Sequence, residues 1–124
     1  MKKAIVTGAN GFVGTAVCKK LLRKGIEVVA VVRHPDKAIS SIAQTNGIRI
    51  INSDLSNFVK LADIIPDRDV DILYHFAWVG SAGSLRGDLD AQINNIKYTC
   101  DTVKACATMG CKRFVFASSI KHPN

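Results

Sequence analysis

Short apolar runs alternate with longer segments in which apolar residues recur every three or four positions. The short runs are residues 3–7, 27–32, 48–51, 72–76 and 113–117. They are rich in β-branched and aromatic side chains, and residues 27–32 show almost no polar alternation, which is typical of a strand buried on both faces of a parallel sheet. We therefore expect five strands.

The longer segments have the spacing of helices. They are residues 12–24, 35 to about 46, 55–65 and 88 to about 109. In the last segment the apolar positions step by four and three in turn: Leu89, Ile93, Ile96, Cys100, Val103 and Ala107. Gly25 and Gly110 follow two of these helices, where glycine commonly ends a helix. Strands that alternate with helices predict an α/β fold with one parallel sheet, and 124 residues suit one domain.

Composition narrows the class of protein. Hydrophobic residues make up 48% of the chain and charged residues 22%, which is ordinary for a globular protein. No apolar run approaches the roughly 20 residues that span a bilayer, and the apolar run after the first residues is too short for a signal peptide. We therefore expect a cytoplasmic protein with no membrane partner.

The net charge of +7 is spread over the sequence. The densest basic group, Lys19, Lys20, Arg23 and Lys24, covers the outer face of one predicted helix, and we interpret it as a solvated face that helps to attract anionic ligands. A nucleic-acid-binding protein would concentrate its basic residues on one element. We therefore expect no nucleic-acid partner, and a basic nucleic-acid-binding protein is the weakest alternative.

The four cysteines, at positions 18, 100, 106 and 111, form no CxxC pair and have no histidine at ligand spacing. We therefore expect no metal site. Cys18, Cys100 and Cys106 fall on apolar helical stripes, so we expect small buried side chains in a reducing compartment rather than disulfides.

The glycine turn, residues 8–14 (GANGFVG), lies between the first predicted strand and the first predicted helix. A strand, a glycine-rich turn and a helix form the context of the dinucleotide-binding fingerprint. Gly8 allows the sharp turn, Gly11 lets a phosphate approach the backbone, and Gly14 lets the helix pack close to the sheet. The free amides at the helix start then face a pyrophosphate. A tight turn without a ligand is the alternative.

With the preceding threonine, the turn reads TGxxGxxG, which resembles the short-chain dehydrogenase/reductase superfamily in its extended branch of nucleotide-sugar epimerases, dehydratases and reductases. Four further segments resemble that family in its order and spacing: SDLS at 53–56, HFAW at 75–78, NNIKYT at 94–99 and RFVFASS at 113–119. The resemblance covers nearly all of the chain, which corresponds to the first part of a usual member. It implies a Rossmann fold, a doubly wound parallel sheet of strand order 3-2-1-4-5, with the cofactor across the switch point between the first and fourth strands.

The resemblance also implies site residues. Asp54 matches the acidic residue near the adenine, Ala77 the segment along the cofactor, and Asn95 the asparagine of the long helix. Ser119 matches the catalytic serine, and Ser118 beside it is the less favoured candidate. The expected cofactor-binding residues are Gly8, Asn10, Gly11, Phe12, Val13, Gly14, Arg33, Asp54, Leu55, Phe76, Ala77, Trp78, Asn95 and Ser118.

Three residues of these segments have plain structural alternatives. Asp54 could simply cap a helix, and His75 could be a satisfied histidine of the core. Trp78 could be a lid on the core rather than a ligand contact.

The end of the second strand bears on the choice of cofactor. NAD enzymes usually carry an acidic residue there to hold the ribose hydroxyls, whereas this chain has Arg33 and His34. A guanidinium can bind the 2′-phosphate of NADP, so we expect NADP in preference to NAD. Asp36, close by, favours NAD, and Arg33 is alternatively a plain surface residue.

The family chemistry is reversible hydride transfer at a sugar hydroxyl or carbonyl, with a tyrosine as acid/base and a lysine four residues on. Here Trp78 and Thr102 stand four residues after Tyr74 and Tyr98. We expect the missing pair and the domain for the nucleotide-sugar substrate to lie beyond Asn124, and no turnover from this chain alone.

We therefore interpret the chain as part of a longer NAD(P)-dependent oxidoreductase. A truncated gene is one alternative, and a stand-alone, non-catalytic NADP-binding redox sensor is the other. The resemblance also implies a homodimer through the long helix.

Overall fold

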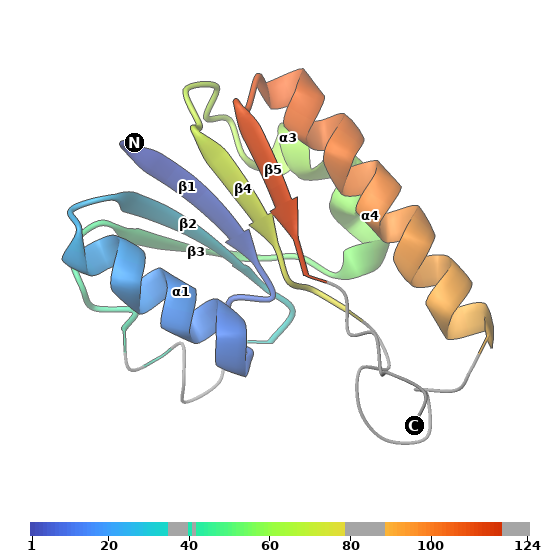
Figure 1. Ribbon diagram of the computed structural model, residues 1–124, viewed down its shortest axis with the longest axis horizontal. Coiled ribbons are helices and arrows are strands. Elements are labelled where there is room, and N and C mark those ends of the chain that lie inside the picture. The colour runs from blue at the N-terminus through green and yellow to red at the C-terminus, as the bar shows by residue number, and fades with distance from the viewer. Residues whose placement is uncertain (35–39, 41, 79–88, 118–124) are drawn as a thin grey trace.

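The computed structural model describes residues 1–34, 40, 42–78 and 89–117, and it contains a five-stranded parallel sheet (Figure 1). The strands are β1 (Lys3–Thr7), β2 (Glu27–Val32), β3 (Ile48–Asn52), β4 (Ile72–His75) and β5 (Arg113–Phe116). Their order is β3-β2-β1-β4-β5, and every neighbouring pair is parallel. The predicted fold class and strand order are confirmed.

Helices cover both faces of the sheet. They are α1 (Phe12–Arg23), the 3-10 helix η1 (Leu55–Lys60), α3 (Leu61–Ile64) and α4 (Leu89–Met109). Figure 1 shows α1 on one side of the sheet and α3 and α4 on the other. The single helix predicted for residues 55–65 is thus a 3-10 helix followed by one short α-helix. The helix predicted for 35–46 falls partly outside the described residues, and residues 42–46 lie in turns and a bend instead.

Alternate residues of β1 enter two different cores. Ala4 and Val6 pack with Cys18 of α1, whereas Ile5 packs with Phe58 of η1 on the opposite face. All five side chains are buried, and burial of an aliphatic side chain the size of Ile5 contributes about 1.5–3 kcal/mol. This burial on both faces explains why the sequence of β1 lacks polar alternation.

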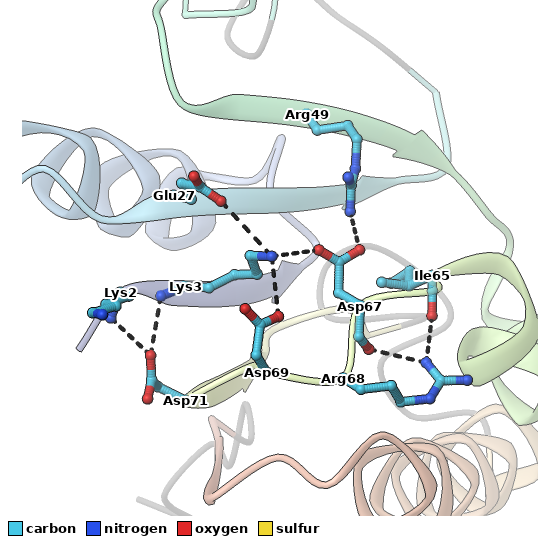
Figure 2. Close-up of polar contacts among 9 residues, drawn as sticks. All are labelled: Lys2, Lys3, Glu27, Arg49, Ile65, Asp67, Arg68, Asp69 and Asp71. Carbon is cyan, nitrogen blue, oxygen red and sulfur yellow. Dashed lines mark hydrogen bonds and ion pairs between the residues drawn. The ribbon is translucent and has the colours of Figure 1, made fainter.

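Charged side chains tie the amino ends of the strands together (Figure 2). The buried carboxylate of Asp67, between α3 and β4, accepts hydrogen bonds from Lys3 Nζ of β1 at 2.7 Å and from the Arg49 guanidinium of β3. These bonds lower the pKa of Asp67, and the same carboxylate raises the pKa of Lys3. We call Lys3, Arg49 and Asp67 the amino-edge clamp. Beside it, Asp71 accepts the backbone N–H groups of Lys2 and Lys3 at 2.7 and 3.1 Å.

Helix α4 turns its most apolar side away from the sheet. This outer stripe consists of Leu89, Ile93, Ile96, Cys100 and Val103, all of them exposed. The side that faces the sheet and η1 buries smaller or more polar residues, among them Thr102, Ala105 and Cys106. Small side chains allow a close approach of the helix to its neighbours, which leaves the larger aliphatic residues outside.

The cysteines show the same division. All four are free thiols, and Cys18 and Cys106 are buried as predicted. The expectation that Cys100 is buried is wrong, because Cys100 belongs to the outer stripe.

Candidate functional site

The chain changes direction across the sheet between β1 and β4. From β1 it continues to β2 and β3 on one side, whereas β4 and β5 lie on the other. In open α/β sheets, ligands bind outside the carboxyl ends of the strands at such a switch point. Here the segments that leave the two strands are the glycine turn after β1 and residues 76–78 after β4.

Two glycines of the turn leave no room for a side chain. Gly8 has a φ of +64°, and a Cβ there would lie 2.7 Å from the backbone nitrogen of Ala77. A Cβ on Gly14 would lie 2.1 Å from the carbonyl oxygen of Gly8. Gly8 therefore makes the sharp turn, as predicted, and also lets the turn touch the segment after β4. Gly14 lets α1 pack directly on the turn.

The start of α1 faces outward without a cap. Gly11 is the N-cap residue, and no side chain among the described residues caps it. Helix geometry leaves the backbone N–H groups of residues 12–14 without an acceptor inside the helix. Phe12 is 95% exposed and Val13 is 52% exposed, and the first turn of α1 holds no acidic residue. Uncapped amides at the positive end of a helix dipole suit an anionic ligand.

Gly11 differs from the other two glycines. Among the described residues, a Cβ at this position would meet only the carbonyl oxygen of Gly8, at 3.4 Å. These residues therefore tolerate a side chain at Gly11, and none of them fills the space that its Cβ would take.

The turn is also fastened to the end of β2. The backbone N–H of Ala9 donates to the carbonyl of Val31 at 3.3 Å, and the side-chain amide of Asn10 donates to the carbonyl of His34 at 2.8 Å. Arg33 and His34 are exposed immediately after β2. The residues that we expect to select the cofactor thus lie beside the glycine turn.

A buried hydroxyl joins the two strands at the switch point. Thr7 Oγ1 accepts the backbone N–H groups of Phe76 and Ala77 at 3.1 and 3.2 Å, and it lies 2.8 Å from His75 Nδ1. Burial lowers the pKa of His75 to about 4, so the ring is neutral at physiological pH. Sequence reasoning missed Thr7. The signal was a polar residue at the end of a buried strand, since such a group needs a buried partner.

Asp54 follows β3, at the same edge of the sheet as the glycine turn. It occupies the N-cap position of η1 but makes no capping hydrogen bond with any described group, and it is exposed. The capping alternative is therefore not supported. Leu55 is buried in the core, so only its main chain can face a ligand.

The remaining expected site residues differ in burial and in the element that carries them. Phe76, Ala77 and Trp78 are half-buried after β4. Asn95 is buried in α4, where its Nδ2 donates to Gln92 Oε1 at 3.3 Å. Ser118 and Ser119 lie outside the described residues.

The described residues offer neither a membrane span nor a metal cluster. No described helix has the length and apolar character that crossing a membrane requires. Within the same residues, no group of three or more histidine, cysteine or acidic side chains is arranged to hold a metal ion.

Sequence comparison adds an independent line of evidence. The sequence pattern of the NAD dependent epimerase/dehydratase family matches residues 4–122. A UDP-glucose 4-epimerase of Klebsiella pneumoniae is 30% identical over 123 residues, which cover 94% of this chain and 88% of that protein. The 2-alkyl-3-oxoalkanoate reductase of Shewanella oneidensis is 28% identical over 117 residues, which cover 94% of this chain and 28% of the reductase.

Structural comparison agrees. The structure of MoeE5 in complex with UDP-glucuronic acid and NAD superposes with a TM-score of 0.73 and 28% sequence identity. The match covers 94% of this chain and 36% of MoeE5. The chain therefore spans about a third of the length of both MoeE5 and the reductase.

Proposed function

The chain belongs to the NAD dependent epimerase/dehydratase family, and we propose that it forms the dinucleotide-binding domain of a nucleotide-sugar epimerase or dehydratase. The observation that carries the proposal is the glycine turn at the switch point, where Gly8 and Gly14 admit no side chain and the start of α1 is uncapped. MoeE5, a relative with the same fold, holds NAD and UDP-glucuronic acid. In the proposed enzyme a further domain holds the nucleotide sugar.

Each part of the site has a proposed task. The amides of residues 12–14 and the positive end of α1 hold the diphosphate. The exposed carboxylate of Asp54 lies toward the adenine end, and Ala77 and Trp78 line the path along the cofactor. Ser119 bonds the reacting oxygen of the substrate. When held by these residues, the dinucleotide would supply the redox chemistry, as an acceptor and donor of hydride.

Calorimetry with NAD and NADP on the purified chain tests this function. We expect binding of at least one dinucleotide with a stoichiometry of one. If neither binds, the proposal is wrong.

Arg33 supports NADP as the preferred cofactor, since its exposed guanidinium follows β2 beside the glycine turn. The cofactor of MoeE5 is NAD, so the preference needs a direct test. We expect NADP to bind more tightly than NAD, and Arg33→Ala to weaken NADP binding about tenfold, the effect of one charge-assisted hydrogen bond. Tighter binding of NAD by the unmodified chain would contradict this assignment.

We expect no epimerase or reductase turnover from these 124 residues alone, because neither Tyr74 nor Tyr98 has a lysine four residues on. Measurable turnover by the purified chain would show that another residue supplies the acid/base. The alternative of a redox sensor finds no support, since the relatives described above are named as an epimerase and a reductase.

The outer stripe of α4 supports a homodimer. Its residues step by four and three, which is the spacing of seams between packed helices, and all five are exposed. Exposed aliphatic residues in a continuous row mark interaction surfaces. We propose that a second copy of the chain covers this stripe.

A further inference from the structure

Residues 76 and 77, which follow β4, contact both Thr7 at the end of β1 and Gly8 in the glycine turn. A Cβ on Gly8 would lie 2.7 Å from the backbone nitrogen of Ala77. The N–H of Ala77 donates to Thr7 Oγ1 at 3.2 Å. The N–H of Phe76 is shared between the same oxygen, at 3.1 Å, and the main-chain carbonyl of Thr7, at 3.2 Å. The Thr7 hydroxyl therefore helps to hold the main chain at the switch point, above all at Ala77, whose N–H donates to it.

The hydrogen bonds of the Thr7 hydroxyl determine which ring nitrogen of His75 carries the proton. A hydroxyl has one proton to donate and two lone pairs that accept. Two backbone N–H groups already occupy the lone pairs, so the hydroxyl proton is left for His75 Nδ1 at 2.8 Å. Nδ1 must then carry a lone pair, and the ring proton of His75 lies on Nε2. The opposite tautomer would place three N–H donors around one oxygen.

Aromatic side chains surround the ring of His75. His75 is 1% exposed. Phe114 stacks on the ring with a centroid distance of 6.1 Å, and Phe58 packs against it at 5.9 Å in a T-shaped arrangement. Nε2 has no hydrogen-bond partner among the described residues. Among these residues, Nδ1 is therefore the ring nitrogen that makes a polar contact.

We propose that His75 is a positioning residue for the dinucleotide. Its Nδ1 lone pair orients the Thr7 hydroxyl, and the hydroxyl oxygen fixes the main chain of Phe76 and Ala77 where the cofactor passes. His75 acts through Thr7 and is itself shielded from the ligand. This inference rests on the proposed function, and it adds a residue that sets cofactor affinity from inside the core.

Two substitutions of His75 distinguish the effect of its hydrogen-bond acceptor from the effect of its aromatic ring. His75→Asn places a side-chain oxygen near the present position of Nδ1, whereas His75→Phe keeps an aromatic ring between its neighbours and removes the acceptor. With NAD and NADP as probes in calorimetry, we expect His75→Phe to weaken binding about tenfold, the effect of one misplaced hydrogen bond. We expect His75→Asn to bind within about twofold of the unmodified chain. Unchanged affinity in His75→Phe, or equal losses in both variants, would overturn the proposal.

The tautomer is measured on the unmodified chain by nitrogen-15 NMR of the histidine ring. We expect the proton on Nε2, and a proton on Nδ1 would overturn the proposal whatever the affinities are. This measurement still decides if His75→Phe does not fold.

A second pair of variants, at Thr7, tests the hydroxyl through which His75 is proposed to act. Thr7→Val removes the hydroxyl at nearly constant volume, and Thr7→Ser keeps it. We expect weaker dinucleotide binding in Thr7→Val only, and equal binding by the two variants would count against the proposal. If the unmodified chain binds neither NAD nor NADP, the proposed function fails and the role of His75 fails with it. Binding that all four variants leave unchanged would overturn the role of His75 alone.

Discussion

Gly11 and Gly14 stand three positions apart, yet their substitutions have different expected consequences. A Cβ on Gly14 would lie 2.1 Å from the carbonyl oxygen of Gly8, whereas a Cβ on Gly11 meets nothing closer than 3.4 Å. We expect Gly14→Ala to destabilise the protein by about 2 kcal/mol or more, because backbone must move.

For Gly11→Ala we expect a loss of under about 1 kcal/mol in stability and a loss of dinucleotide affinity of tenfold or more, since the methyl group occupies the proposed phosphate position. Urea unfolding and calorimetry on both variants check the pair. Unchanged affinity in a folded Gly11→Ala protein would show that no phosphate lies there.

His75 gives the protein a specific dependence on pH. Burial lowers its pKa from 6.5 to about 4, so between these values the unfolded chain binds a proton that the folded chain does not. The contribution is fully present above pH 6.5 and is lost as the pH falls toward 4. From pH 7.5 to 5 we expect a loss of about 2 kcal/mol from this residue. Urea unfolding at both pH values measures it, and His75→Phe serves as the control because the carboxylates titrate equally in both proteins. Equal losses in the two proteins would contradict the assignment to His75.

Helix α4 shows what an amphipathic pattern leaves undetermined. Its spacing predicted a helix, and the helix is there, but the apolar row does not say which partner it faces. Thr102, Ala105 and Cys106 pack inward, and no single one of them is a strong sign of a core. The central strands β1, β2 and β4 were predictable because burial on both faces leaves little polar alternation. The contact of Thr7 with His75 was not, since it joins residues that are far apart in the sequence.

The outward row of α4 leads to a prediction about assembly. Ile96 is 62% exposed, so Ile96→Glu should change the stability of the monomer by less than about 0.5 kcal/mol. It should nevertheless separate the proposed dimer, because a charge would be buried in the seam. Size-exclusion chromatography with light scattering gives the mass of each species. Asn94→Glu is the matched control, since it adds the same charge at an exposed position of α4 outside the stripe. A monomer in the unmodified protein, or a dimer in Ile96→Glu, would rule out this interface.

In the molecule as a whole, stabilising charges and ligand-facing groups occupy opposite edges of one sheet. The amino-edge clamp lies where the strands begin (Figure 2), and the glycine turn lies where β1 ends. Asp67→Asn removes the shared carboxylate charge from Lys3 and Arg49. We expect it to destabilise the protein by about 1–2 kcal/mol, less than for a fully buried pair because Arg49 is half exposed.

Dinucleotide affinity should stay unchanged in Asp67→Asn, which calorimetry and thermal unfolding test together. Asp69→Asn is the control, because Asp69 also bonds Lys3 but its side chain is 79% exposed. A large change in affinity, or equal destabilisation by both substitutions, would contradict this division. The lowered pKa of Asp67 makes stability depend on pH in the same direction as His75 does. The stabilisation by Asp67 is present above the ordinary carboxyl pKa and is lost as the pH falls below it.

The distance between these two edges matters for how such a protein can evolve. Lineages that move to hotter or more saline habitats can rewrite the charges around Asp67, and adjust melting temperature, without disturbing recognition at the other end of the strands. Selection for a new cofactor can in turn act on the loops after β1 and β2 while the opposite rim preserves foldability. Changes in thermal stability and changes in ligand specificity can thus arise at separate sets of positions within one small domain.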